Sequence, residues 1–219
     1  MKNKQFTTAD QVALEEIMFH RRDIRGNNFL SDQIPDNVVQ KILFSASLAP
    51  SVGFSQPWEF VVIDDDKIKN QIHQSFLVET ERAGASFSRE KRAMYEKLKL
   101  EGILEAPVNI AVFYKPSEDS VLGQNTMVET GEYSVVCAIQ NMWLMARALN
   151  IGLGWVSILD PEEVKKVLNA PSSHKLVAYL CIGYVKEFFT APELEKLKWK
   201  KRKEISSTVY MNKYSGSGS

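Results

Sequence analysis

The stretch "YSVVCAIQNMWLMARALNIGLGWVSI", residues 133–158, carries the strongest fold signal in the chain. Its first part, 133–149, is apolar on almost every side, with Val135, Ile139 and Met142 among the apolar residues. A helix without a polar face is buried in a core or in an interface. The segment "GLGWVSIL" that follows is a strand candidate. A long buried helix joined to a strand predicts a domain that mixes helices with a sheet.

The flanking sequence predicts further elements of both kinds. Helices are predicted at about 8–26, 34–50, 66–101 with a break at 84–88, and after Asp160-Pro161. Strands are predicted at 58–64, 108–114 and 175–185. Thr8 and Gln11 have the spacing of a capping box, and Pro35 opens the second helix. We therefore expect a single α+β domain over 1–214, and we exclude the linker-like tail "SGSGS" (215–219).

The bulk composition excludes several classes of protein. Lys+Arg and Asp+Glu are equal at 27 each, so no global field attracts nucleic acid or anionic lipid. The first residues lack the apolar region of a signal peptide, and no apolar run approaches the roughly 20 residues of a membrane span. Cys137 and Cys181 lie in apolar runs, which predicts two buried free thiols. We expect a cytoplasmic protein that binds neither nucleic acid nor membrane.

Common cofactor and metal signatures do not occur in the sequence. It contains no GxGxxG after a strand, no Walker loop, no HExxH and no CxxC. His20, His73 and His174 are scattered without a metal-ligand pattern. This argues against a Rossmann dehydrogenase and against a metalloenzyme.

The stretch "RRDIR" crowds Arg21, Arg22 and Arg25 around Asp23. Arginine offers a rigid fork of donors that fits phosphate or carboxylate. If the helix continued, Arg21 and Arg25 would share one face and Asp23 would point elsewhere. The alternative is a solvated helix end, where cations favour the C-terminal dipole.

Two further stretches allow a ligand to approach the backbone. In "LAPSVGFSQPWEFVV" (48–62), Ser51 follows the helix-ending Pro50, although this stretch by itself favours a simple helix-to-strand loop. In "GLGWVSILDP" (152–161), Gly152 and Gly154 permit close approach of a ligand or of another backbone, and Ser157 stands at the strand end. Close strand packing is the alternative there.

Together these stretches resemble one family. The segments are "RRDIRGNNF", "APSVGFSQPWEFV", "LKLEGILEAPVNI", "YSVVCAIQNMWLMARALNIGLGWVSI" and "GYVKEFFTAPELEKLKWKKR", which span residues 21–202. The combination resembles the FMN-dependent nitroreductase fold and, within it, the 5,6-dimethylbenzimidazole synthase family. The resemblance implies a central mixed or antiparallel sheet flanked by helices, in an intertwined homodimer with FMN sites built from both chains.

The resemblance also implies the site. Reduced FMN would be the substrate, with dioxygen as co-substrate and no metal. The residues that the resemblance places at the flavin are Arg21, Arg22, Asp23, Ile24, Arg25, Pro50, Ser51, Leu98, Ser157 and Arg202. Asp23 stands where ordinary nitroreductases usually carry a small hydroxyl residue, and it is the expected proton carrier. Ser157 is the second expected catalytic residue, and we expect the neighbouring arginines to keep Asp23 ionised.

The implied reaction is the oxygen-dependent fragmentation of reduced FMN to 5,6-dimethylbenzimidazole and erythrose 4-phosphate. The helical insert 76–101 resembles a lid, so a separate NAD(P)H-dependent flavin reductase would supply the reduced flavin. The alternatives are an NAD(P)H-dependent nitro- or quinone reductase and a non-catalytic flavin-binding protein. Two departures from the family pattern are Glu59 after Trp58 and a more basic tail, which leaves the phosphate ligand open among Lys200, Lys201 and Arg202.

Overall fold

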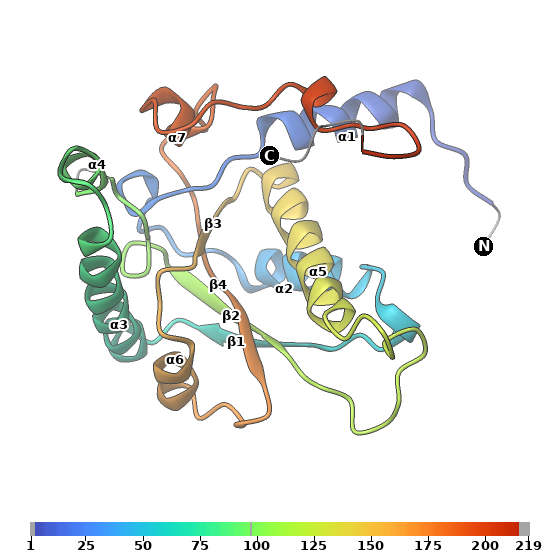
Figure 1. Cartoon of the computed structure of the whole chain (residues 1–219), viewed down its shortest axis with the longest axis horizontal. Coiled ribbons are helices and arrows are strands. Elements are labelled where there is room, and N and C mark those ends of the chain that lie inside the picture. The colour runs from blue at the N-terminus through green and yellow to red at the C-terminus, as the bar shows by residue number, and fades with distance from the viewer. Residues whose placement is uncertain (1–2, 97, 215–219) are drawn as a thin grey trace. The chain divides into compact units, whose positions relative to one another are not determined.

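The computed structural model describes residues 3–96 and 98–214, and its centre is a four-stranded antiparallel sheet (Figure 1). The strands are β1 (Trp58–Ile63), β2 (Val108–Tyr114), β3 (Gly152–Val156) and β4 (Lys175–Gly183), in the order β1-β2-β4-β3. β2 is buried at nearly every position, as expected for a central strand covered on both faces. The four predicted strands are confirmed, and β3 and β4 end a few residues earlier than the predicted segments.

Helices cover both faces of the sheet. In the first part of the chain they are α1 (Thr8–His20), α2 (Asp36–Ser47), α3 (Asp66–Ala85), α4 (Arg89–Tyr95), α5 (Thr130–Ala148) and α6 (Pro161–Val167). α2 and α5 pack on one face, and α3 and α6 lie on the other (Figure 1). Each face has its own buried cluster, one around Ile110 and Met142 and the other around Phe113 and Tyr179. The predicted break in 66–101 separates α3 from α4.

α5 is buried on one side only. Val135, Ile139 and Met142 face the sheet and are fully buried. Tyr133 and Cys137 lie on the other side and are exposed, because a helix resting on a sheet turns one stripe of side chains toward it. The prediction of a buried thiol is therefore wrong for Cys137. It is confirmed for Cys181, where burial raises the pKa of the thiol.

α1 ends before the arginine cluster. Its capping box is formed by Thr7 and Asp10, one residue earlier than the predicted pair. Its last residue is His20, and Arg21 already has extended backbone angles. The prediction that the helix runs to Gly26 is wrong, because β3 hydrogen-bonds the backbone that follows. No residue of α1 is buried within this chain.

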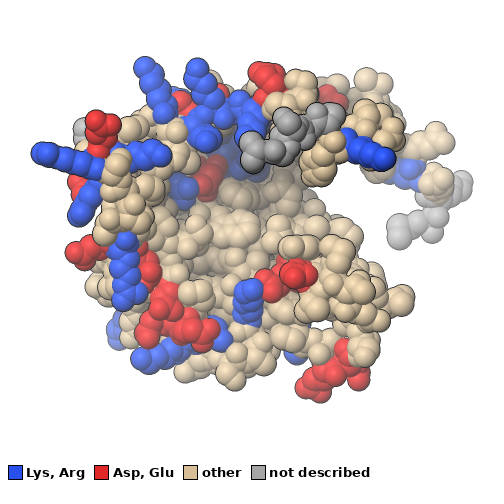
Figure 2. All heavy atoms as spheres, viewed as in Figure 1, with Lys and Arg blue, Asp and Glu red and all other residues tan. Residues whose placement is uncertain are grey.

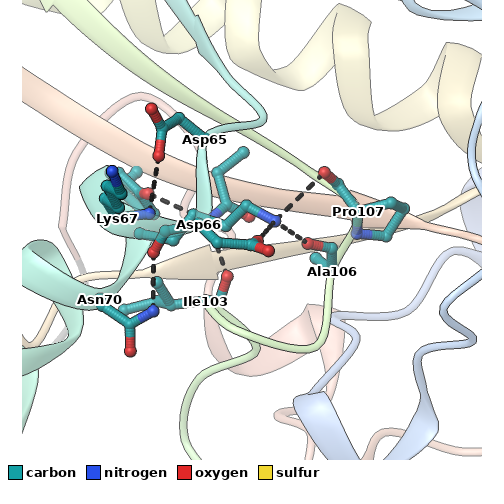
Figure 3. Close-up of polar contacts among 10 residues, drawn as sticks. Asp65, Asp66, Lys67, Asn70, Ile103, Ala106 and Pro107 are labelled. Carbon is teal, nitrogen blue, oxygen red and sulfur yellow. Dashed lines mark hydrogen bonds and ion pairs between the residues drawn. The ribbon is translucent and has the colours of Figure 1, made fainter.

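The start of α3 is fixed by polar contacts (Figure 3). The Asp65 carboxylate accepts the amide of Lys67 at 2.7 Å, which caps the helix. One turn on, the buried Lys69 ammonium lies 3.1 Å from Asp66. It also donates to the carbonyl oxygens of Ala106 and Pro107, which are drawn in Figure 3. α3 is thereby tied to the segment that leads into β2.

The chain divides into two units, Met1–Phe188 and Phe189–Ser219. The second unit holds α7 (Glu193–Lys196) and a short 3-10 helix, Ile205–Ser207. Lys and Arg side chains gather over α7, whereas acidic and basic side chains alternate over α3 and α6 (Figure 2). Within the part of the chain that the structure describes, no helix is long and apolar enough to cross a membrane.

Candidate active site

The segment "RRDIR" lies against β3. Asp23 forms a parallel bridge with Leu153, and the amide of Ile24 donates to the Leu153 carbonyl at 3.1 Å. A Cβ atom added to Gly154 would overlap the carbonyl oxygen of Ile24, and one added to Gly152 would overlap Val185. These two glycines therefore serve the close packing of backbone on backbone, which is the alternative that the sequence left open.

The carboxylate of Asp23 is held at both oxygens. Oδ1 accepts the backbone amide of Trp155 at 3.0 Å, and Oδ2 forms an ion pair with Nη2 of Arg25. Burial raises the pKa of Asp23, and the opposing effects of Arg25, the Trp155 amide and Arg21 do not cancel it. Arg25 and Arg21 therefore lower the pKa of Asp23 without setting the direction of its shift, and its ionisation at neutral pH stays a prediction. The side chain still exposes 33% of its area, so a ligand can reach it.

Arg25 and Arg22 use their guanidinium groups within the chain. Nη1 of Arg25 donates to the carbonyl oxygens of Leu100 and Trp155, at 3.0 and 3.3 Å. Arg22 is buried, and its Nη1 donates to the carbonyls of Phe19 and Arg21 at 2.7 Å each. Arg22 thus closes the C-terminal end of α1, as a cation at a helix end does, although it is buried and not solvated.

Arg21 lies over an aromatic ring. Its guanidinium carbon is 4.7 Å from the centre of the Trp143 ring, and the rings of Trp143 and Trp155 are 6.3 Å apart. The indole N–H of Trp143 donates to the carbonyl of Arg22 at 3.1 Å. Sequence reasoning counted Trp143 only as an apolar residue of α5. The need of a half-buried indole N–H for an acceptor is the signal that could have marked it.

The Pro50–Ser51 turn lies elsewhere in the chain. The Ser51 hydroxyl accepts the amide of Gln56 at 3.0 Å, and the amide of Val52 donates to the hydroxyl of Ser134 at 3.0 Å. Ser134 belongs to the first turns of α5, whereas Trp143 lies toward its C-terminal end. Within one chain, the turn and the Asp23 cluster therefore stand at different ends of the same helix.

The other predicted site residues have distinct positions. Ser157 is exposed directly after β3, two residues beyond Trp155. Leu98 is half-buried just after α4, in the stretch whose Leu100 carbonyl contacts Arg25. Arg202 is exposed and belongs to the second unit. Its contact with phosphate stays a prediction, as do the flavin contacts of the other residues.

A buried acidic cluster next to Arg25 was missed from the sequence. Glu101 is almost completely buried, and its Oε1 lies 2.6 Å from the ammonium of Lys99. Glu105 pairs with the same ammonium at 2.8 Å. Burial alone would lower the pKa of Lys99, but the bonds to Glu101 and Glu105 outweigh burial and raise it. A charged pattern such as "KLEGILE" is usually read as a solvated surface, and so it gave no signal.

Glu59, the acidic departure after Trp58, has two basic partners. Its carboxylate lies 3.0 Å from the Lys115 ammonium and 2.9 Å from Nε2 of His174. The hydrogen bond from Lys115 is the largest of the effects that lower the pKa of Glu59, and His174 adds to it. These two contacts fasten the edge strand β1 to the end of β2 at Lys115 and to the start of β4 at His174.

Sequence comparison identifies relatives across most of the chain. The profile of the Nitroreductase family matches residues 18–184. The 5,6-dimethylbenzimidazole synthase of Rhodospirillum rubrum is 45% identical over 200 residues, which cover 90% of this chain and 94% of that protein. A synthase of the same name from Rhodobacter capsulatus is 36% identical and covers 89% and 94%.

Solved structures share the fold. An iodotyrosine deiodinase bound to FMN and 3-iodo-L-tyrosine superposes with a TM-score of 0.72 at 23% identity, over 92% of this chain and 99% of that one. A BluB-like flavoprotein from Clostridium difficile superposes with a TM-score of 0.69 at 22% identity, over 91% and 99%. The expected nitroreductase-like architecture is thereby confirmed.

Proposed function

The chain belongs to the nitroreductase family, in the branch of the 5,6-dimethylbenzimidazole synthases, and from this premise we propose that it fragments reduced FMN in the presence of dioxygen. The products are 5,6-dimethylbenzimidazole and erythrose 4-phosphate. Reduced FMN is the substrate and supplies both the electrons and the ring carbons of the product. The protein contributes binding, orientation, shielding from water and the movement of a proton.

The observation that carries this proposal is the environment of Asp23. A carboxyl group serves best as a general acid and base when its pKa moves toward the working pH. Burial moves the pKa of Asp23 in that direction, while Trp155 and Arg25 fix the orientation of its oxygens. Each carboxylate oxygen can accept more than one hydrogen bond, so both can still exchange a proton with a ligand. The half-buried position of Asp23 suits an acid–base group, because it combines a shifted pKa with access for a ligand.

The residues around Asp23 suit a phosphorylated flavin. Arg21 is stacked on Trp143, and a stacked guanidinium binds an anion through its edge. Ser157 presents a hydroxyl at the open end of β3, and Leu98 offers half-buried apolar surface for a ring. We assign the phosphate to Arg21 and the side near the ring to Ser157 and Leu98. Arg25, which is engaged with Asp23 and two carbonyls, holds the proton carrier in place.

A homodimer would complete the site. Ser134, which contacts the Pro50–Ser51 turn, and Trp143, which contacts Arg21, are about two and a half helical turns apart, roughly 13 Å along α5. One chain therefore holds two partial sites. The exposed apolar side chains of Phe44, Leu48 and Tyr133 on α2 and α5 provide a surface for a second copy, and the region around these helices carries few charges (Figure 2).

Mixed dimers test this arrangement. A variant with Asp23→Asn and a variant with Ser51→Trp each carry one damaged half. If each site takes Asp23 from one chain and Ser51 from the other, a mixed dimer has one intact site and regains product formation. If both halves came from the same chain, mixing would restore no activity.

We further propose that a separate flavin reductase supplies the substrate. α4 follows α3 after a short break, and residues 98–101 beyond α4 reach the Arg25 side of the site. Such an insert can cover the flavin and keep a nicotinamide away. NADPH alone should therefore reduce bound FMN slowly, and an added flavin reductase should restore product. Rapid, saturable oxidation of NADPH by the protein itself would favour the nitroreductase alternative.

The main experiment starts without oxygen. The protein is incubated anaerobically with reduced FMN, air is admitted, and the products are separated by chromatography. We expect 5,6-dimethylbenzimidazole and erythrose 4-phosphate in equal amounts. Quantitative return of intact FMN would instead support a reductase or a non-catalytic flavin-binding protein.

A further inference from the structure

A buried carboxylate to which the proposed reaction assigns no role lies in the segment that contacts Arg25. Glu101 stands between α4 and β2, and it is 1% exposed. An ionised carboxylate is strongly disfavoured away from water unless it is paired and hydrogen-bonded. Its presence there therefore calls for a reason in the local structure.

The close partners of the Glu101 carboxylate lie in its own segment, and one neighbour belongs to α3. Oε1 lies 2.6 Å from the Lys99 ammonium and 3.9 Å from Nε2 of His73, which belongs to α3. Oε2 accepts the amide of Ile103 at 2.7 Å. The side chain thus closes a tight turn over 99–103, with His73 of α3 near it but beyond hydrogen-bond distance.

The backbone of the same turn supports the Asp23 cluster. The Leu100 carbonyl accepts Nη1 of Arg25 at 3.0 Å, and the Glu101 carbonyl accepts the amide of Gly26 at 2.7 Å. Arg25 in turn pairs with Asp23. A single turn therefore receives hydrogen bonds from two consecutive residues of the segment that carries the proposed proton carrier.

The contact between the two segments leaves no space. A Cβ atom on Gly102 would lie 2.7 Å from the ring of Phe29 and 3.2 Å from the amide nitrogen of Gly26. A Cβ atom on Gly26 would lie 2.5 Å from the carboxylate of Glu105. A shift of the turn would therefore be transmitted directly to residues 25–26.

The far end of the segment is also anchored. The carbonyls of Ala106 and Pro107 point toward the ammonium of Lys69 on α3 (Figure 3). The stretch 99–107 is thus closed on itself by Glu101 at one end and fastened to α3 by Lys69 at the other. The end at Glu101 is the one whose backbone carbonyls accept hydrogen bonds from Arg25 and Gly26.

We infer that Glu101 is a positioning residue for the site. Its carboxylate fixes the carbonyls of Leu100 and Glu101 against Arg25 and Gly26, and through Arg25 it holds Asp23 in its orientation. The inference rests on the proposed function only in the role that it gives to Asp23. The positioning itself is a property of the flavin-free protein.

The test uses two substitutions of Glu101 and one matched control. Glu101→Met removes the carboxylate and keeps the volume, so the buried site stays filled. Glu101→Gln keeps an oxygen that can accept the Ile103 amide, and should restore part of the effect. Glu105→Gln is the control, because Glu105 shares the Lys99 ammonium but lies on the more exposed side of the turn.

The first measurement is amide hydrogen exchange in the flavin-free protein. Loss of the contacts of the Glu101 carboxylate should speed hydrogen exchange of the Gly26 amide by about tenfold to a hundredfold in Glu101→Met and less in Glu101→Gln. The amide of Ile110 in β2 reports on the whole fold and should change much less, and Glu105→Gln should resemble the wild type. If the Gly26 and Ile110 amides accelerate together, or Gly26 does not change, Glu101 is only a structural residue and the inference is overturned.

The second measurement is product formed per flavin consumed. We expect this ratio to fall at least about tenfold in Glu101→Met, with partial recovery in Glu101→Gln, while the affinity for FMN changes little. An unchanged ratio in both variants would refute the inference. If the wild type forms no benzimidazole, the proposed function fails, and the exchange data alone then decide whether Glu101 positions the segment.

Discussion

Asp23 and Glu59 are carboxylates at opposite edges of one sheet. Asp23 bridges to the edge strand β3 and pairs with Arg25, whereas Glu59 lies on the edge strand β1 and pairs with Lys115 and His174. Both have cationic neighbours, yet the pKa of Asp23 is raised and that of Glu59 is lowered. At Asp23 burial is the largest effect on the pKa, whereas at Glu59 the hydrogen bond from Lys115 is larger than the effect of burial.

The difference shows that a cationic neighbour does not by itself identify what a carboxylate does. Glu59 gains from its ionised form and so belongs to the structure that holds β1. Asp23 is held where burial disfavours its ionised form. Such a position reduces the stability of the fold, and proteins retain such positions at functional sites. The comparison therefore separates a structural ion pair from a candidate catalytic one.

The largest effect should follow from removing the acid–base group at the β3 edge. Asp23→Asn keeps the size and the hydrogen bond from Trp155 but cannot take up a proton. Because general acid–base catalysis contributes roughly a hundredfold to ten-thousandfold, we expect product per flavin to fall by about that factor. The measurement is chromatography of benzimidazole after aerobic oxidation of bound reduced FMN.

The matched change at the other edge should leave the reaction intact. Glu59→Gln also removes a paired carboxylate but lies on β1, across the sheet from Asp23. We expect its product yield to equal that of the wild type. Equal losses in Asp23→Asn and Glu59→Gln would mean that the comparison reflects general stability and not catalysis.

The cations at the two edges should differ in flavin binding. Arg21→Ala should weaken FMN binding by about tenfold to a hundredfold, the loss expected for a charge-assisted contact. Riboflavin, which lacks the phosphate, should bind the variant and the wild type alike. Lys115→Ala is the control and should bind FMN normally. Fluorescence titration measures all five affinities, and an equal loss for riboflavin would show that Arg21 does not bind the phosphate.

Close packing should distinguish the β3 edge from a glycine position that has room for a side chain, such as Gly84 in α3. Gly154→Ala introduces a Cβ atom that overlaps the Ile24 carbonyl, and overpacking costs about 1–3 kcal/mol. For a protein of this size Tm should fall by about 2–10 °C. Gly84→Ala in α3 meets only the Tyr95 ring at 3.5 Å, an ordinary contact, and should raise Tm slightly. A Gly154→Ala variant as stable as the wild type would show that the segment at Ile24 can move away.

The sequence predicted the elements better than it predicted their contacts. Strands β1 and β2 are read directly from runs of β-branched and aromatic residues, because burial and strand propensity act in the same direction there. The end of α1 was placed too late because residues 21–25 could continue the helix. What ends it is a hydrogen bond to Leu153, a contact between segments far apart in the sequence.

The site shows the same limit. The residue types around Asp23 marked an anion site, but the sequence could not show that Arg25 and Arg22 use their donors on neighbouring carbonyls. Nor could it show that the effect of burial on the pKa of Asp23 outweighs the effects of Arg25 and Arg21. Glu101 and Trp143 were missed because their roles depend on partners that only the fold brings near.

The smallest effect concerns stability against pH, where the two carboxylates should have opposite signs. The lowered pKa of Glu59 means that its ionised form is favoured in the folded state, so its stabilisation is present above the ordinary value of 4.5 and is lost as pH falls through the folded value. Glu59→Gln should therefore lower the free energy of unfolding at neutral pH by about 0.2–1 kcal/mol, as for an exposed pair, and the loss should disappear in acid.

The raised pKa of Asp23 means that the folded state binds its proton more readily than the unfolded state, so this group destabilises the fold above its folded pKa. Asp23→Asn should therefore be more stable than the wild type at neutral pH, and the gain should shrink as pH falls toward 3.8. Urea unfolding at several pH values measures both trends. Destabilisation of Asp23→Asn at neutral pH would show that pairing with Arg25 outweighs burial, and the contrast between the two edges of the sheet would be lost.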